Sequence, residues 1–235
     1  MCNKGEEDDN LEGELRKEIE GTDESDSGDE KDDLKLSGTH FAYDHPGILV
    51  RTQEQPNLLQ RMSWGLRPYF CESVERADKI ALGTLNAKCE TIFKLASFRM
   101  PILKQRCLIY FSAFYETQHR SKKEKIKYKI SLRGKRYMIL AGVYDYWTNP
   151  DTGKTVKSCS IVTCEANPLM AEIHNMKKRM PVILEEDVAM KWLNPALTRP
   201  EIESLMVQYP EEKMLAVPLD PIERDLFSMD DSSIS

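Results

Sequence analysis

Short apolar segments recur along the chain from residue 47 onward and predict mainly β-strands. The segment 106–115 is strongly apolar, as expected of a buried strand, and 125–132 (KIKYKISL) alternates with a period of two. A turn at 149–153 (NPDTG) joins the predicted strands 136–147 and 158–163. The remaining predicted strands are 47–52 and 182–184.

Helical patterns are fewer and do not alternate regularly with the strands. We predict helices at 87–98, 167–176, 186–192 and 201–207. The segment 64–68 (WGLRP) is interpreted as a strand end or a turn. Many strands with irregularly interspersed helices favour an α+β fold of mixed or antiparallel sheets over a doubly wound parallel sheet.

An acidic stretch near the N-terminus has a different composition. Leu11, Leu15 and Ile19 form a short helical stripe within it, and 21–33 is predicted to be disordered or a solvated loop. This stretch either forms a solvated face or competes electrostatically with DNA for the basic surface of the protein. We therefore expect four parts: a nucleophile segment (1–5), an acidic, disordered or loosely ordered insertion (6–36), a globular domain (37–220) and an acidic tail (221–235).

The charge of the chain is unevenly distributed. Of its 33 Lys and Arg and 39 Asp and Glu, residues 1–33 hold four basic and 15 acidic ones. The rest of the 235-residue chain is therefore mildly basic, which suits a nucleic-acid partner. No apolar run has membrane-spanning length and the N-terminus does not resemble a secretory signal, so we expect a cytoplasmic protein, or a nuclear one in a eukaryote.

The six cysteines show no C-x-x-C pair and no spacing typical of a metal site. In a reducing compartment they are expected to be free thiols. We predict neither a metal nor a cofactor.

Cys2 follows the initiator methionine, and small residues at this position favour removal of Met1. Removal would leave an amine and a thiol on adjacent carbons, with pKa values near about 8 and 8.5. Such an aminothiol can condense with an aldehyde to a five-membered thiazolidine. Alternatively, the amine can serve as base for its own thiol, as in N-terminal-nucleophile hydrolases. The position of the cysteine is also compatible with chance.

Three polar residues stand at the ends of predicted elements. Asn86 lies at the start of the predicted helix, where it could be a cap. Glu116 follows aromatic residues, an environment that suits a general acid–base, or it is an exposed strand end. His174 lies late in a short predicted helix, as a cap or as a catalytic group.

The order of these residues resembles the SRAP family, the SOS-response-associated peptidases understood as abasic-site processing proteins. The resemblance covers Cys2 and about 40–195. It rests on 64–68 (WGLRP), the block around Asn86 (NAKCET), Glu116, 141–144 (AGVY) and the block from His174 to RMPVIL. It implies an SRAP-like fold with a basic channel for single-stranded DNA.

By this resemblance, Cys2 would trap the aldehyde of an abasic site as a thiazolidine. Asn86 would position the Cys2 amine and the sugar, Glu116 would move protons, and His174 would open the sugar ring and hold or reverse the adduct. DNA lyase activity and self-removal of Met1 are also implied. The expected partner is single-stranded DNA containing abasic sites, bound by a monomer. The residues implied in DNA binding are Lys4, Trp64, Lys88 and Arg179, with a core position as the alternative for Trp64.

Several features depart from the family pattern. Asn3 and Lys4 follow Cys2 in place of Gly-Arg, and Lys88 replaces a bidentate arginine with a point charge. The spacer between His174 and Arg179 is longer than in the shortest members. Two other functions stay open: an N-terminal-nucleophile amidotransferase or peptidase, and a single-strand-binding module without activity.

Overall fold

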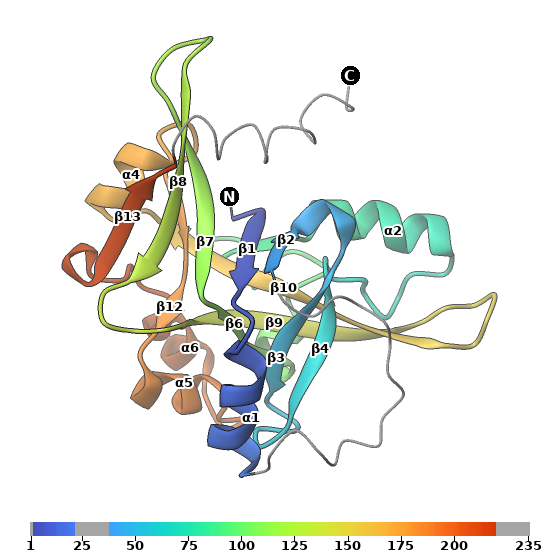
Figure 1. The fold of residues 1–235 in the computed structure, drawn as a ribbon. Helices are drawn as coiled ribbons and strands as arrows, with labels where there is room; N and C mark the ends of the chain where they lie inside the picture. Colours follow the sequence, from blue (N-terminus) through green and yellow to red (C-terminus); the bar gives the residue numbers. More distant parts are fainter. Residues whose placement is uncertain (1, 22–37, 220–235) are drawn as a thin grey trace.

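Two β-sheets make up most of the computed structural model, which describes residues 2–21 and 38–219 (Figure 1). The first sheet has five antiparallel strands in the order β13-β8-β7-β1-β2. Its strands are β1 (Lys4–Glu7), β2 (Gly38–Phe41), β7 (Ala113–His119), β8 (Lys125–Leu132) and β13 (Met214–Pro218).

The second sheet closes on itself. Its path runs β10-β4-β3-β6-β9, and β9 pairs again with β10, so these strands form a barrel. The β4–β10 pair is parallel, whereas β3, β6 and β9 pair antiparallel. The strands are β3 (Gly47–Thr52), β4 (Leu59–Trp64), β5 (Asn86–Lys88), β6 (Arg106–Phe111), β9 (Met138–Thr148), β10 (Thr155–Glu165), β11 (Arg179–Pro181) and β12 (Ile183–Leu184).

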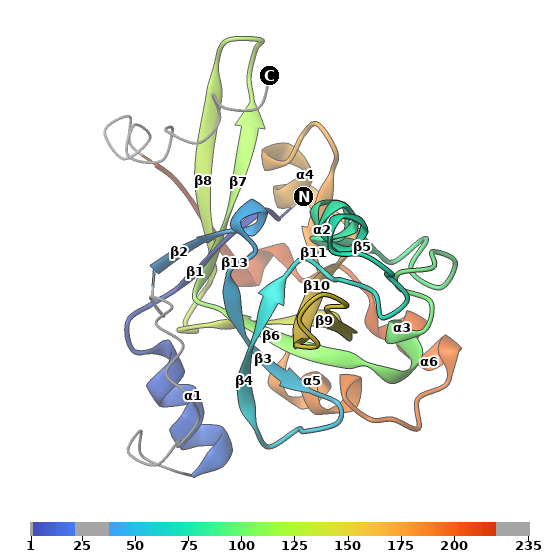
Figure 2. The same ribbon diagram turned by 90° about the vertical axis from the view of Figure 1, so that its right-hand side faces the viewer.

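Short helices flank the two sheets (Figure 2). They are α1 (Leu11–Glu20), α2 (Val74–Gly83), α3 (Pro101–Lys104), α4 (Pro168–Ile173), α5 (Glu186–Trp192) and α6 (Arg199–Leu205), with single turns at Ala42–Asp44 and Glu211–Lys213. The predicted α+β class with mixed sheets is confirmed. None of the helices in the described ranges is long and apolar enough to cross a lipid bilayer.

The chain passes from one sheet to the other at Ser112. The prediction of one strand at 106–115 was wrong here, because β6 ends at Phe111 and β7 begins at Ala113. The backbone N–H and the hydroxyl of Ser112 both donate to the carbonyl of Glu6, at 2.8 and 2.9 Å. This break places the barrel strand and the strand carrying Glu116 in different sheets.

The helix predicted at 87–98 is absent. Asn86–Lys88 instead forms β5, which pairs in parallel with β10, and a series of turns follows. Ala87 is fully buried against this sheet. Pairing with β10 therefore overrides the local helical pattern, and the interpretation of Asn86 as a helix cap is wrong.

The expectation of a disordered or loosely ordered insertion at 6–36 was wrong for its first part. Residues 6 and 7 belong to β1 and α1 follows, with Leu11 and Leu15 buried in the core. Acidic side chains of this segment pair with the barrel: Arg61 lies 3.0 Å from Glu7 and 2.7 Å from Glu12. Charge pairing and two buried leucines thus outweigh the acidic composition. Residues 22–37 lie outside the described ranges, as does the predicted tail 221–235.

Replacing Leu15 with Ala is expected to lower the free energy of unfolding by about 2–5 kcal/mol, because a fully buried side chain leaves a cavity. Urea unfolding measures this change. Lys17→Ala, at an exposed position of the same helix, serves as the control and should change stability by less than about 0.5 kcal/mol. Equal stability of Leu15→Ala and the unmodified protein would mean that α1 does not pack on the core.

Candidate active site around Cys2

Four residues predicted to carry chemistry come together from four separate parts of the chain. Cys2 precedes β1, Asn86 begins β5, Glu116 lies within β7 and His174 caps the end of α4. All four are buried; Cys2 is 1% exposed. A cluster of buried polar groups assembled from distant segments is typical of a functional site.

The position of Cys2 is fixed by the strand that follows it. β1 lies between β2 and β7, and the carbonyl of Asn3 accepts from the backbone N–H of Ala42 at 2.9 Å. A Cβ on Gly5 would lie 2.5 Å from the ring of Phe111, so only glycine allows β1 this close to the barrel. The thiol is therefore anchored within three residues of a rigid sheet.

Asn86 connects β5 to the N-terminal segment. Its Nδ2 donates to the carbonyl of Cys2 at 2.9 Å and to Oδ1 of Asn3 at 3.2 Å. Both partners are acceptors, which identifies the nitrogen end of the amide. Oδ1 of Asn86 is buried and has no hydrogen-bond partner among the described residues. An unsatisfied buried acceptor costs about 1–3 kcal/mol, and its presence is explained by a catalytic role or by a bound water or ion.

Glu116 and His174 form the second half of the cluster. Oε1 of Glu116 lies 3.8 Å from Nδ1 of His174, and that nitrogen is 2.9 Å from the carbonyl of Arg179. Burial lowers the pKa of His174, while the negative charge of Glu116 acts in the opposite direction. The imidazole is therefore neutral at pH 7 and available to accept a proton. The interpretation of Glu116 as an exposed strand end is wrong, because its side chain is buried.

The thiol of Cys2 is also affected by this environment. Burial raises its pKa well above the ordinary range, and the charge of Glu116 raises it further. The thiol is thus protonated at neutral pH and needs a nearby base before it can attack an electrophile. Glu116, which interacts electrostatically with both Cys2 and His174, is placed to take part in that proton transfer.

Two of the residues implied in DNA binding are held inside the protein. Trp64 is 0% exposed, packs on Phe111 with ring centroids 5.5 Å apart, and donates from Nε1 to the carbonyl of Leu85 at 2.9 Å. Stacking on a base is therefore excluded in this conformation, and the core alternative holds. The ammonium of Lys4 is buried over the rings of Phe41 and Tyr115, at 4.5 and 4.8 Å, so it does not present itself to a phosphate.

The other two lie at the surface near the cluster. Lys88 is exposed at the end of β5. Arg179 is half-buried, pairs with Glu90 and donates to the carbonyl of Thr163 at 2.7 Å. A phosphate at Arg179 would compete with Glu90, whereas Lys88 is accessible without rearrangement.

Asn3 was interpreted only as a departure from the family pattern, but it contacts the site. Its Oδ1 accepts from Asn86, and its Nδ2 donates to the hydroxyl of Tyr43 at 3.1 Å. This bridge joins the segment after β2 to β5. The only signal in the sequence was the position of Asn3 beside Cys2, which does not reveal the partner Tyr43.

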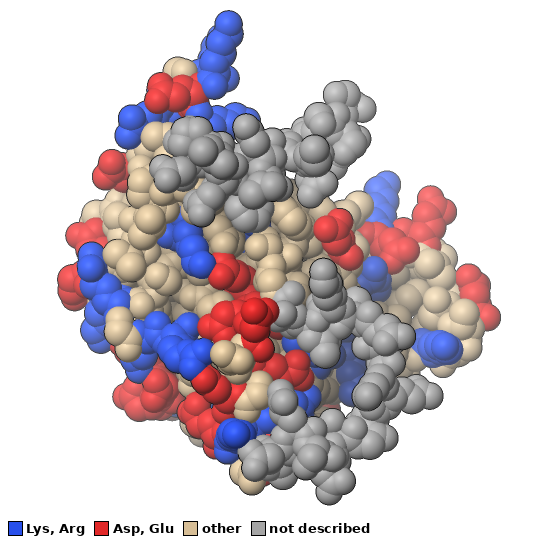
Figure 3. Space-filling model, in the orientation of Figure 1, with Lys and Arg blue, Asp and Glu red and all other residues tan. Residues whose placement is uncertain are grey.

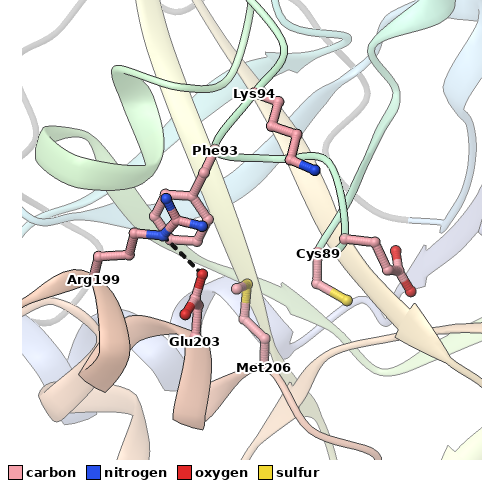
Figure 4. A pocket seen from close by; sticks show the side chains of 7 residues that line it. Cys89, Phe93, Lys94, Arg199, Glu203 and Met206 are labelled. Atoms are coloured by element: carbon pink, nitrogen blue, oxygen red, sulfur yellow. Dashed lines mark hydrogen bonds and ion pairs between the residues drawn. The ribbon is translucent and has the colours of Figure 1, made fainter.

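A hollow of about 230 Å³ lies beyond Lys88, outside the cluster (Figure 4). The guanidinium of Arg199 lies 4.5 Å from the ring centroid of Phe93 and pairs with Glu203 at 2.8 Å. The walls of this hollow mix charged side chains with Cys89, Phe93 and Met206, and we assign no ligand to it. Within the described ranges, no group of three or more His, Cys, Asp and Glu could hold a metal ion.

The sequence of this chain is similar to a known protein family and to several of its members. The family model described as "SOS response associated peptidase (SRAP)" matches residues 1–222. The abasic site processing protein YoqW of Bacillus subtilis is 36% identical over 161 residues, 68% of either chain. The abasic site processing protein HMCES of Gallus gallus is 30% identical over 181 residues, 69% of this chain but 52% of that one, so this chain spans about half its length.

Solved structures show the same fold. A crystal structure of a protein from Bacteroides thetaiotaomicron has 36% sequence identity and a TM-score of 0.77, covering 82% of both chains. A protein from Bordetella bronchiseptica has a TM-score of 0.75 at 20% identity, covering 93% of this chain and all of that one. The second likeness concerns the fold alone.

Proposed function

Because this chain belongs to the SRAP family, whose relatives YoqW and HMCES are named abasic site processing proteins, we propose that it binds single-stranded DNA and traps abasic sites covalently through Cys2. The observation that carries the proposal is the buried thiol of Cys2 inside the cluster of Asn86, Glu116 and His174. An aldehyde is the electrophile that a terminal aminothiol captures most stably.

The reaction requires a free α-amine on Cys2, and hence removal of Met1. The amine attacks the aldehyde carbon of the ring-opened sugar, and loss of water gives an imine. The thiol sulfur then bonds to the imine carbon, its proton passes to the nitrogen, and a thiazolidine results. Release of Met1 would use the same residues: the Cys2 thiol attacks the carbonyl of Met1, the peptide nitrogen leaves as the free amine, and water hydrolyses the resulting thioester to free methionine and the thiol.

The cluster has a group for each proton transfer. Glu116 accepts the thiol proton, and neutral His174 exchanges protons with the sugar hydroxyl as the ring opens. The free Oδ1 of Asn86 accepts from the Cys2 amine or from a sugar hydroxyl. DNA lyase activity would arise at the imine, where the same bases can remove a proton from the neighbouring carbon and expel the phosphate.

The proposal is tested on a denaturing gel with a single strand containing one abasic site. We expect a protein–DNA band that survives heating and denaturant, formed with the abasic strand and not with the intact strand of the same sequence. Intact-mass measurement of the protein checks in parallel that Met1 has been removed. Absence of the band, with Met1 removed and the strand verified, would contradict the proposal.

The rate of crosslinking is expected to rise with pH beyond about 8.5, where an ordinary thiol is already half ionised. Burial and Glu116 raise the pKa of the Cys2 thiol, so more alkaline solution is needed to remove its proton. His174, with a lowered pKa, should cause a loss of rate only below about pH 6.5. Single-turnover rates across this pH range test both statements; a plateau already at neutral pH would contradict the first.

A further inference from the structure

The hairpin formed by β7 and β8 projects from the body of the protein and ends in a concentration of positive charge (Figures 1 and 3). Residues 120–127 (RSKKEKIK) hold five Lys or Arg and one acidic residue. We call the distal part of the hairpin, residues 119–127, the basic arm. Arg120, Lys122, Lys123 and Lys125 are all exposed, and Glu124 lies 3.9 Å from Arg120.

The two faces of the hairpin differ in character. Directly opposite residues on antiparallel strands point to the same face. Glu116 opposes Tyr128 and Gln118 opposes the buried Ile126, so this face turns toward the protein. The other face carries the lysines of β8: Lys125 opposite His119, Lys127 opposite Thr117 and Lys129 opposite Tyr115.

The lysines of β8 follow one another at alternate positions along one face. Two strand residues span roughly 6.6 Å, which is comparable to the separation of neighbouring phosphates in a stretched single strand. Toward the body of the protein the row ends at Lys129, whose ammonium pairs with Glu6 at 2.8 Å, and the buried ammonium of Lys4 does not extend it. The exposed lysines are therefore those at the tip of the hairpin, Lys122, Lys123 and Lys125.

The arm is held in a fixed position relative to the candidate active site. The free edge of β7 at His119 is occupied by Asn175, the residue after His174. Nδ2 of Asn175 donates to the carbonyl of His119 at 2.7 Å, and its Oδ1 accepts from the N–H of His119 at 3.1 Å. Gln118 donates to the carbonyl of Glu172 at 3.2 Å. A polyanion bound along the arm would thus have a defined direction relative to His174 and Glu116.

We propose that the basic arm binds the phosphates of a DNA single strand beyond the nucleotides that reach Cys2. This inference rests on the proposed function, since the arm extends the same binding surface. The arm begins about 10 Å from Glu116 along β7, so it contacts the flanking strand and takes no part in the chemistry. Regularly spaced lysines on a strand match a regularly spaced polyanion, and phosphate contacts of this kind are independent of base sequence.

The test compares long and short strands. The arm variant replaces Lys122, Lys123 and Lys125 with Glu in the full chain. A matched control carries Glu at three exposed lysines on other parts of the surface, Lys104, Lys154 and Lys191. Binding to intact strands of about 5 and about 25 nucleotides is measured by fluorescence anisotropy over a range of salt concentrations.

The arm variant is expected to bind the long strand at least about tenfold more weakly at low salt, with a salt dependence shallower by about two units. Binding of the short strand, and crosslinking of a short abasic strand, should remain as in the unmodified protein. Unchanged affinity of the arm variant for the long strand would overturn the inference. An equal loss in the control variant would also overturn it, because the effect would then be one of net charge.

Two further outcomes distinguish DNA binding by the arm from the crosslinking chemistry and from membrane binding. Arm-dependent binding of the long strand by a protein that never crosslinks abasic DNA would contradict the proposed function and leave the arm assignment standing. Arm-dependent sedimentation with phosphatidylserine vesicles, combined with arm-independent DNA binding, would overturn the inference and identify the arm as a membrane-binding surface. Circular dichroism before and after heating checks that both variants are folded.

Discussion

Cys2→Ala is expected to abolish the heat-stable crosslink to abasic single-stranded DNA. Alanine at this position keeps the terminal amine once Met1 is removed but has no sulfur to close the ring. The reaction should therefore stop at the imine, which hydrolyses on a denaturing gel. Addition of borohydride before denaturation should trap that imine and restore a band, because reduction makes the carbon–nitrogen bond permanent.

Cys71→Ala provides the matched control for this variant. Cys71 lies in a small cluster with Ala77 and Trp147, apart from the Cys2 site, so its removal should leave the crosslink at full yield. A stable crosslink formed by Cys2→Ala without borohydride would show that another residue forms the bond. The proposed thiazolidine would then be wrong, whatever the fate of DNA binding.

Glu116→Gln is expected to lower the rate of crosslinking by about 10²–10⁴-fold. Glutamine keeps the size of the side chain but cannot accept the thiol proton. The variant should also shift the pH profile. The charge of Glu116 raises the pKa of the Cys2 thiol, so its removal lowers that pKa and moves the remaining activity toward lower pH.

Glu172→Gln, an exposed carboxylate on the neighbouring helix α4, is the control for Glu116→Gln. It should leave both the rate and the pH profile unchanged. A purely structural role for Glu116 would reduce stability without moving the pH profile. Full crosslinking by Glu116→Gln with an unchanged profile would exclude Glu116 from the proton transfer.

The sequence predicted the strands better than the parts that depend on contacts between distant segments. The strand Gly47–Thr52, the alternating strand Lys125–Leu132 and the helix Glu186–Trp192 were predicted with their observed bounds. Their periodicity arises locally. In contrast, β5 forms a strand because it pairs with β10, about 75 residues farther along the chain. The local pattern around β5 suggested a helix instead.

In the candidate site, too, some features followed from the sequence and others depended on contacts between distant segments. The order of Cys2, Asn86, Glu116 and His174 along the chain suggested a common site, and the structure brings them together. Whether the Lys4 ammonium and the Trp64 ring are buried could not be decided from the sequence. Their burial depends on β1 packing beside Tyr115 and on Phe111 packing against Trp64. Likewise, the stripe of Leu11, Leu15 and Ile19 indicated the helix α1, but the acidic composition favoured disorder because the pairing of its carboxylates with arginines such as Arg61 in β4 could not be predicted.

The most direct test of the central claim is peptide mapping of the crosslinked product by mass spectrometry, after digestion of both protein and DNA. We expect the sugar remnant on the peptide that begins with Cys2, with the amine and the thiol both blocked and with no need for borohydride. A remnant on a lysine, on an internal cysteine or only on the amine of Cys2 would contradict the account.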